Sequence, residues 1–230
     1  MAALVDGEER DFSYILEQDC DIEPILGDTE AGRYILRHSC AHLLAQAVVE
    51  IYPDAQPTIG PPIENGFYYD FKMDPVGDGD LKKIEKKMQE HIRANHTLTR
   101  EEHDNRTLRD MFAGNPFKIE IMNDKIGMDI GSSAYRQGDF VDLCLGPHVP
   151  STSYLRWFKL TGTSQAYWKG DNSNESLVRI YGMCFYSKDE LRERERQIEE
   201  AKKRDHKKIG KEMELYLSLI HISEPTRQVP

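Results

Sequence analysis

The stretch Tyr34-Ile-Leu-Arg-His-Ser-Cys-Ala-His-Leu-Leu-Ala-Gln-Ala-Val-Val-Glu-Ile51 predicts a helix around which the fold is organised. Its apolar residues recur every three or four positions, which is typical of one helix face packed on a core, at Leu36, Cys40, Leu43, Ala47 and Ile51. Tyr52-Pro53-Asp54 then ends the helix, because proline cannot continue it.

Two histidines of this helix point away from its apolar stripe. His38 and His42 are separated by four positions, so their side chains project from the same side. At about 100° per residue they fall nearly opposite the stripe. A lone histidine is more simply explained as a hydrogen-bonding core residue, but a spaced pair favours a helix that lies between a core and a cleft.

A second polar group follows about a hundred residues later, in Asp142-Leu-Cys-Leu-Gly-Pro-His148. Gly146-Pro147 is expected to turn the backbone so that Cys144 and His148 point together. With the helical histidines they supply the four ligands of a tetrahedral metal site, and equally the lining of a hydrolytic pocket. A zinc protease is not expected, because Ser39 follows the first histidine where such helices carry a glutamate base.

Further segments supply the surrounding layers. Residues 59–63 and 67–71 predict two strands around a turn at Asn65-Gly66, with Phe67, Tyr69 and Phe71 on one face. Residues 80–94 predict a helix whose inward positions are Leu81, Ile84, Met88 and Ile92, and a further helical segment, 108–112, ends at Asn115-Pro116. Residues 117–121 alternate like a half-buried strand, which places Lys118 where it can bind an anion or position water.

The remaining segments complete an α+β prediction. Strands of a mixed or antiparallel sheet are expected at 158–160, 166–168 and 177–182, and a small β-rich module is expected in residues 1–31. Ser187-Lys-Asp-Glu190 predicts a capping box that opens a long, sparsely apolar helix to about Tyr216. The predicted fold class is a sheet with packed helices, preceded by the β-rich module and followed by a connecting helix.

Composition narrows the functional class. No apolar run of the 230 residues approaches the roughly 20 that span a membrane, no secretory leader is evident, and four scattered cysteines fit a reducing cytoplasm. A formal net charge of −10 argues against a protein that coats nucleic acid. The lysines concentrated in residues 82–87 and 202–211 are interpreted as exposed side chains on solvated helix faces. A local basic groove formed by these lysines stays an alternative.

In order and spacing, these motifs resemble the amino-terminal half of the bacterial threonyl-tRNA synthetase family. The similar blocks are Arg37–Ala47, Ile59–Asp70, Val141–Pro150, Ala166–Asp171, Arg179–Gly182 and Ala201–Lys211. The resemblance implies four parts: a partial ubiquitin-like TGS module at 1–31, a tRNA editing domain at 32–186, a linker helix at 187–217, and a non-native tail at 218–230. It implies no aminoacylation domain, hence no ATP site, and a monomer.

The resemblance also implies a function. In that family this region hydrolyses the ester of seryl-tRNA formed by mistake on threonine tRNA, using activated water, so the expected partner is a tRNA(Thr) 3′ end that carries serine. A noncatalytic tRNA-binding fragment is the alternative. The expected compartment is the cytoplasm.

Residue by residue, the resemblance implies a catalytic group of His38, His42, Lys118, Cys144 and His148. His38 and Lys118 are the candidates to position or activate water, while the others shape and polarise the pocket. Asp142 is expected to hold the substrate ammonium or hydroxyl, and Tyr69 to contact the terminal adenosine. No cofactor is expected, although zinc at His38, His42, Cys144 and His148 stays open because alanyl editing domains resemble this constellation with metal bound.

Overall fold

The computed structural model describes residues 1–125 and 133–204. The chain divides into two compact units, Met1–Lys188 and Asp189–Pro230. Among the described helices, none combines the length and the apolar content needed to cross a bilayer. The domain boundaries predicted from the sequence stay predictions.

The first unit is built around an antiparallel five-stranded sheet. Strand order is β10-β11-β6-β4, with β5 paired to β6, and the strands are β4 (Gln56–Pro57), β5 (Pro62–Ile63), β6 (Gly66–Lys72), β10 (Trp157–Tyr167) and β11 (Ser176–Phe185). The predicted hairpin is present, and Ile63 pairs with Gly66, so Glu64-Asn65 forms its loop. A Cβ on Gly66 would lie 2.2 Å from the backbone oxygen of Gly182, which explains a glycine inside a strand.

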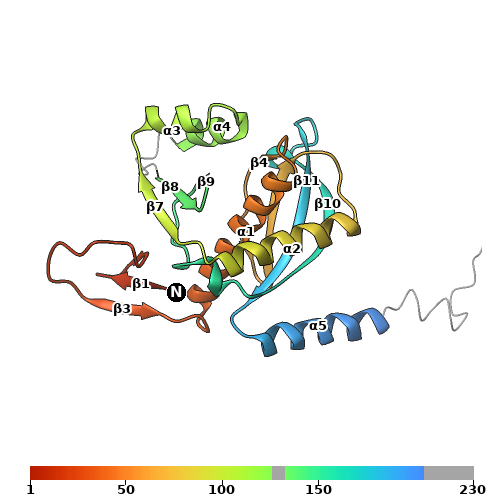
Figure 1. Ribbon diagram of the computed structural model, residues 1–230, viewed down its shortest axis with the longest axis horizontal. Helices are drawn as coiled ribbons and strands as arrows, with labels where there is room; N and C mark the ends of the chain where they lie inside the picture. The colour runs from red at the N-terminus through yellow and green to blue at the C-terminus, as the bar shows by residue number, and fades with distance from the viewer. Residues whose placement is uncertain (126–132, 205–230) are drawn as a thin grey trace, which may run out of the picture. The chain divides into compact units, whose positions relative to one another are not determined.

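Helices α1 (Glu30–Ile51) and α2 (Asp78–Ala94) cover one face of this sheet (Figure 1). The predicted face of Phe67, Tyr69 and Phe71 is buried against them, as are Leu81, Ile84 and Met88 of α2. α1 starts four residues earlier than predicted, because the hydroxyl of Thr29 accepts a hydrogen bond from the backbone N–H of Gly32. Every residue from Ser39 to Val48 is buried, so α1 has protein on all sides rather than a single buried stripe.

A smaller antiparallel sheet, which the sequence pattern did not predict, lies beside these helices. Its order is β7-β8-β9, and its strands are β7 (Leu98–Glu102), β8 (Ser133–Gln137) and β9 (Phe140–Leu143). Helix α3 (Asn105–Met111) confirms the predicted helical segment, and its Leu108 packs with Ala134 of β8. Two single turns complete the layer, at Thr152–Tyr154 and Trp168–Gly170.

The predicted strand at residues 117–121 is wrong, because this segment belongs to helix α4 (Pro116–Lys125). Asn115 acts as the N-terminal cap: its Oδ1 accepts from the backbone N–H groups of Phe117 (3.1 Å) and Lys118 (3.2 Å). Pro116 occupies the first helical position, where its fixed φ is favourable. Five alternating residues do not distinguish a strand from a short helix, whereas the Asn-Pro start does.

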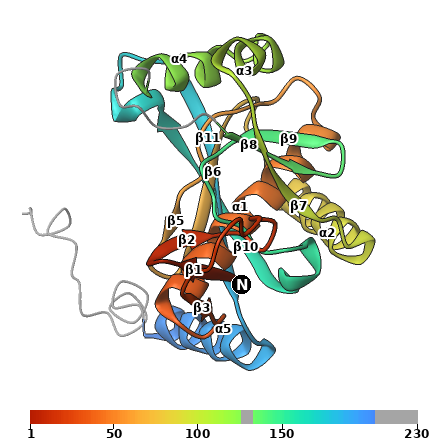
Figure 2. The same ribbon diagram turned by 90° about the vertical axis from the view of Figure 1, so that its left-hand side faces the viewer.

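Residues 1–25 form a three-stranded antiparallel sheet that packs near the start of α1 (Figure 2). Its order is β2-β1-β3, with β1 at Ala2–Val5, β2 at Glu8–Arg10 and β3 at Ile22–Ile25. Ala2 and Ile25 join the same hydrophobic core as Ile35 of α1. This sheet therefore shares its core with the rest of the unit.

The second unit contains helix α5 (Lys188–Lys203), which begins one residue after Ser187, where the capping box predicts it. None of the α5 residues is buried, in agreement with their sparse apolar pattern. The predicted end of this helix at Tyr216 and the predicted tail at 218–230 lie outside the described residues.

The Asn115 cap gives a test of the corrected assignment. Asn115→Ala removes the acceptor for two helical N–H groups and also the Nδ2 donor to the backbone oxygen of Pro57, and it is expected to lower the free energy of unfolding by about 1 to 2 kcal/mol, measured by urea denaturation. Asn172→Ala, in an exposed loop, is the matched control and should change it by less than about 0.5 kcal/mol. Equal stabilities for the two variants would contradict the capping role.

Candidate functional site

The structure brings together the four side chains predicted from the two distant motifs. His38 and His42 lie on α1, and Cys144 and His148 lie in the loop after β9. Cys144 Sγ is 3.3 Å from His38 Nε2 and 3.2 Å from His148 Nε2. One ligand atom from each of the four residues lies within 4.8 Å of the others.

The Gly146-Pro147 turn has the effect expected from the sequence. The peptide bond before Pro147 is cis, and Gly146 has a φ of 74°, in the left-handed region that favours glycine. The backbone N–H of Gly146 points to Cys144 Sγ at 3.3 Å. The loop thus folds back over the sulfur and directs His148 to the same point.

A serine that was not predicted as a site residue orients the ring of His148. Ser39 Oγ donates to the backbone oxygen of Ile35 (2.8 Å) and lies 3.0 Å from His148 Nδ1. The single hydrogen of the Ser39 hydroxyl is used in the bond to Ile35. The hydrogen between Ser39 Oγ and His148 Nδ1 is therefore assigned to Nδ1. The unprotonated Nε2 of a neutral ring then faces Cys144. The sequence signal was a serine between the two histidines, on a neighbouring face of the helix.

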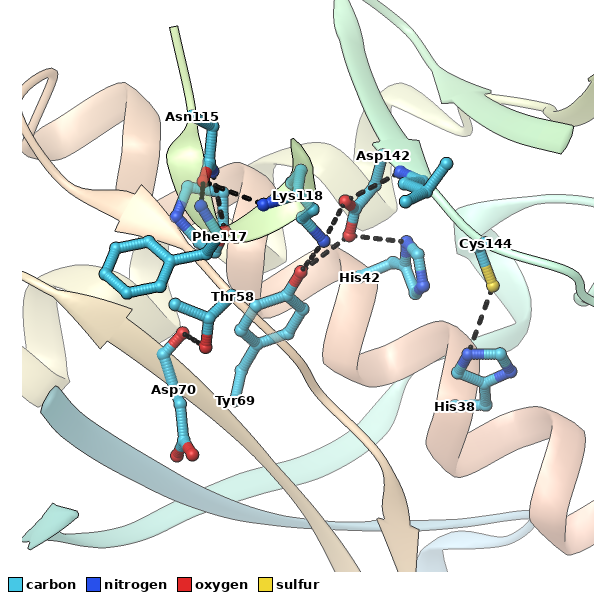
Figure 3. A network of polar contacts seen from close by, with 12 residues as sticks. His38, His42, Thr58, Tyr69, Asp70, Asn115, Phe117, Lys118, Asp142 and Cys144 are labelled. Carbon is cyan, nitrogen blue, oxygen red and sulfur yellow. Dashed lines mark hydrogen bonds and ion pairs between the residues drawn. The ribbon is translucent and has the colours of Figure 1, made fainter. Parts of the chain in front are cut away.

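Asp142 is the centre of a buried polar network (Figure 3). Its Oδ1 is 2.5 Å from Lys118 Nζ and accepts from the backbone N–H of Leu143, and its Oδ2 accepts from the Tyr69 hydroxyl at 2.6 Å. His42 Nδ1 lies 3.4 Å from Oδ2. Lys118 also donates to the Tyr69 hydroxyl at 3.0 Å. Four segments, α1, β6, α4 and β9, therefore meet at one carboxylate.

Burial keeps the histidines neutral. Desolvation lowers the pKa of His38 to about 3, helped by the nearby His42, and lowers the pKa of His42 to about 4 against the opposing effect of Asp142. Desolvation by burial also lowers the pKa of His148 well below its usual value. Burial alone would raise the pKa of Asp142, but the charge of Lys118, followed by that of His42, lowers it overall. The site therefore contains an ionised Asp142 paired with Lys118, together with the uncharged imidazoles of the three histidines.

The two predicted substrate-binding residues are both buried. Tyr69 is 1% exposed, and its hydroxyl donates to Asp142. Asp142 is 2% exposed, and both of its oxygens have partners within the protein. Both residues contact Lys118, and their contact with substrate stays a prediction.

The donor set also fits a metal. Three imidazoles and a thiol supply the ligand types and number of a tetrahedral zinc site. His148 donates from Nδ1 to Ser39, which leaves Nε2 as the ligand atom, as in oriented zinc ligands. A separate cleft of about 1080 Å³, lined by parts of residues 51–55, 72–80, 163–165 and 176–178, contains none of these four residues. The candidate site is therefore assigned from the chemistry of its residues and not from the position of this cleft.

Known proteins resemble this chain over most of its length. Residues 133–181 match the family model described as the threonyl and alanyl tRNA synthetase second additional domain. The chain is 47% identical over 215 residues to a threonine–tRNA ligase of Thermoplasma acidophilum, covering 94% of this chain and 32% of that protein. The ligases of Acetivibrio thermocellus and Bacillus velezensis are each 46% identical, over 94% of this chain and 34% of their own length.

The chain therefore spans about a third of the length of these relatives. The matched domain includes Asp142, Cys144 and His148, and the wider match includes helix α1. The resemblance to the threonyl-tRNA synthetase family is thus confirmed: this chain is similar to about a third of a threonine–tRNA ligase, and its residues 133–181 match the second additional domain of the threonyl and alanyl enzymes.

Proposed function

We propose that this chain hydrolyses the ester of tRNA(Thr) that has been mischarged with serine. The observation that carries the proposal is the group formed by the neutral His38 and His42 and the Lys118–Asp142 ion pair, two hydrogen-bonding imidazoles and a fixed cation in one site. Family membership supports tRNA as the partner and an aminoacyl ester as the substrate class.

The need for such an activity follows from the size of the two amino acids. Serine lacks only the methyl group of threonine, and one methyl group in a binding pocket contributes roughly 1 to 3 kcal/mol of discrimination. A charging site that accepts threonine therefore also accepts serine. A second, hydrolytic site that excludes the methyl group removes the error.

In the proposed reaction, the oxygen of a water molecule attacks the serine carbonyl carbon, and the bond from that carbon to the ribose oxygen breaks. His38 hydrogen-bonds and orients the water through Nδ1, which is buried and has no hydrogen-bond partner among the described residues. Lys118 is 3% exposed and paired with Asp142, so in this proposal its positive charge acts on the developing negative charge of the carbonyl oxygen from behind the pocket wall. The proton lost by the water is returned to the ribose oxygen, which leaves free serine and a tRNA with an intact 3′ end.

The other side chains have supporting roles in this proposal. Asp142 and Tyr69 hold the ammonium of Lys118 in place, and Ser39 fixes the ring of His148. His42, Cys144 and His148 form the wall beside the ester. An acyl-enzyme on Cys144 is not required, because an aminoacyl ester is already reactive towards water.

Deacylation measurements test this proposal directly. The chain is expected to hydrolyse Ser-tRNA(Thr) but not Thr-tRNA(Thr), and His38→Ala should lower the rate about 100-fold, because a reacting group misplaced by about 1 Å can cost about 10²-fold in rate. Lys118→Gln should also lose the activity, because it removes the positive charge of the site. Since this variant leaves the buried Asp142 without its cation, its folding is checked by circular dichroism.

Lys83→Ala is the matched lysine control, since that side chain is exposed on α2, and it should retain the full rate. A wild-type protein that binds tRNA but leaves the seryl ester at its spontaneous rate would support the alternative, a noncatalytic tRNA-binding fragment.

The low histidine pKa values predict an unusual pH dependence. Because the pKa of His38 is about 3 and that of His42 about 4, the enzyme-dependent rate should change less than about twofold between pH 7.5 and 5.5, after the spontaneous rate is subtracted. A histidine with an ordinary pKa of about 6.5 would give a loss of roughly tenfold over that range.

The same shifts affect stability in a defined direction. Below pH 6.5 the unfolded chain takes up protons that the folded site refuses, so the free energy of unfolding should fall from pH 6.5 towards pH 4. Urea denaturation across this range would contradict the assigned pKa values if stability stayed constant.

A second candidate function is zinc-dependent hydrolysis of an aminoacyl-tRNA, which the four clustered ligand atoms favour. His38, His42, Cys144 and His148 would hold the ion, and zinc would supply a Lewis acid and a water of lowered pKa. Metal analysis of protein purified without chelator decides between the two: about one zinc per chain, lost in Cys144→Ser, supports the second. Full activity of metal-free protein after dialysis against a chelator supports the first.

A further inference from the structure

The loop that carries Cys144 and His148 is held by side chains from elsewhere in the chain. Residues 144–149, all described, belong to no helix or strand, so their backbone N–H groups need other acceptors. Val149 donates to Ser39 Oγ at 3.0 Å, and His148 donates to Asp11 Oδ1 at 2.7 Å. Asp11 is 137 positions away, directly after strand β2 of the amino-terminal sheet.

The second carboxylate oxygen of Asp11 accepts a hydrogen bond from Tyr135, whose ring lies beside the ring of His148. The Tyr135 hydroxyl donates to Asp11 Oδ2, and the Tyr135 ring meets the His148 ring edge-on, with centroids 4.4 Å apart. Tyr135 is 2% exposed. A Cβ on Gly146 would lie 1.8 Å from its hydroxyl oxygen, so this tyrosine also packs directly on the turn before Pro147.

We propose that Asp11 is a positioning residue for His148, and that the amino-terminal sheet is for this reason part of the candidate site. Its effect on rate rests on the proposed hydrolysis, but its effect on the His148 ring does not. One carboxylate fixes the backbone of His148 and, through Tyr135, one side of the imidazole. Ser39 and Cys144 fix the two ring nitrogens.

Loss of the carboxylate has two direct consequences. The backbone N–H of the buried His148 and the hydroxyl of the buried Tyr135 both lose an acceptor, and hydrogen bonds to a charged oxygen are the stronger kind. The Tyr135 ring is then free to shift, and the loop can move relative to α1. Displacement by about 1 Å is enough to reduce a catalytic rate about 100-fold.

The first test observes the ring and needs no activity. In ¹⁵N-histidine-labelled protein, the His148 ring nitrogens, assigned by their absence in His148→Asn, should show a protonated Nδ1 and an unprotonated Nε2. In Asp11→Ala both signals should move towards the average of mixed tautomers. Asp11→Asn, which retains an acceptor oxygen for the His148 N–H, should stay close to the wild type.

Asp6→Ala is the matched control, because Asp6 Oδ1 accepts from the backbone N–H of Asp21 within the same sheet module and belongs to no site contact. It should leave the His148 signals unchanged. If Asp11→Ala does not fold, Tyr135→Phe tests the same link, since it removes only the hydroxyl, and should give a smaller shift in the same direction.

The second test measures deacylation of Ser-tRNA(Thr). Asp11→Ala should lower kcat about 10- to 100-fold with KM within about twofold, and Asp11→Asn should recover most of the rate. Unchanged His148 signals in folded Asp11→Ala, or equal losses in Asp6→Ala, would overturn the positioning role. If the wild-type chain hydrolyses no seryl ester, the proposed function fails, and the ring signals alone decide the role of Asp11.

Discussion

The site depends on one buried carboxylate. Asp142 is 2% exposed, and an ionised carboxylate in such surroundings is stable only when it is paired and hydrogen-bonded. Lys118 supplies the charge, while Tyr69, His42 and the backbone of Leu143 supply further contacts. Removing one partner of a buried pair costs about 3 to 5 kcal/mol, so this requirement joins α1, β6, α4 and β9 at a single point.

The pairing also sets the chemical character of the site. The negative charge of Asp142 would favour protonated histidines, but desolvation outweighs it, and the pKa of His42 falls to about 4. Neutral imidazoles can bind water or a metal, whereas imidazolium ions repel cations. The same arrangement is therefore compatible with water-mediated ester hydrolysis and with zinc, which is why the two are separated by metal content and not by geometry.

The contacts around His148 show how a loop without regular secondary structure is given a fixed shape. Ser39 from the central helix contributes two contacts to this loop, whereas Asp11 from the amino-terminal sheet and Tyr135 from β8 contribute one each. Asp11, Ser39 and Tyr135 are far apart from one another in the sequence.

Much of the fold and most of the candidate site could be predicted from the sequence, because they depend on local patterns. The spacing of His38 and His42, the Gly146-Pro147 turn and the alternation of Phe67, Tyr69 and Phe71 each have a short-range physical cause. Residues 117–121 alternate as a strand would, but the Asn115 cap and Pro116 at the first helical position start helix α4 there. By itself the sequence therefore determined the α+β class and the four side chains His38, His42, Cys144 and His148 that form one cluster. Only the tertiary structure decided that Asp142 and Tyr69 are buried in contact with Lys118, and that Ser39 and Asp11 contact His148, because burial and contacts over more than a hundred residues leave no periodic trace in the chain.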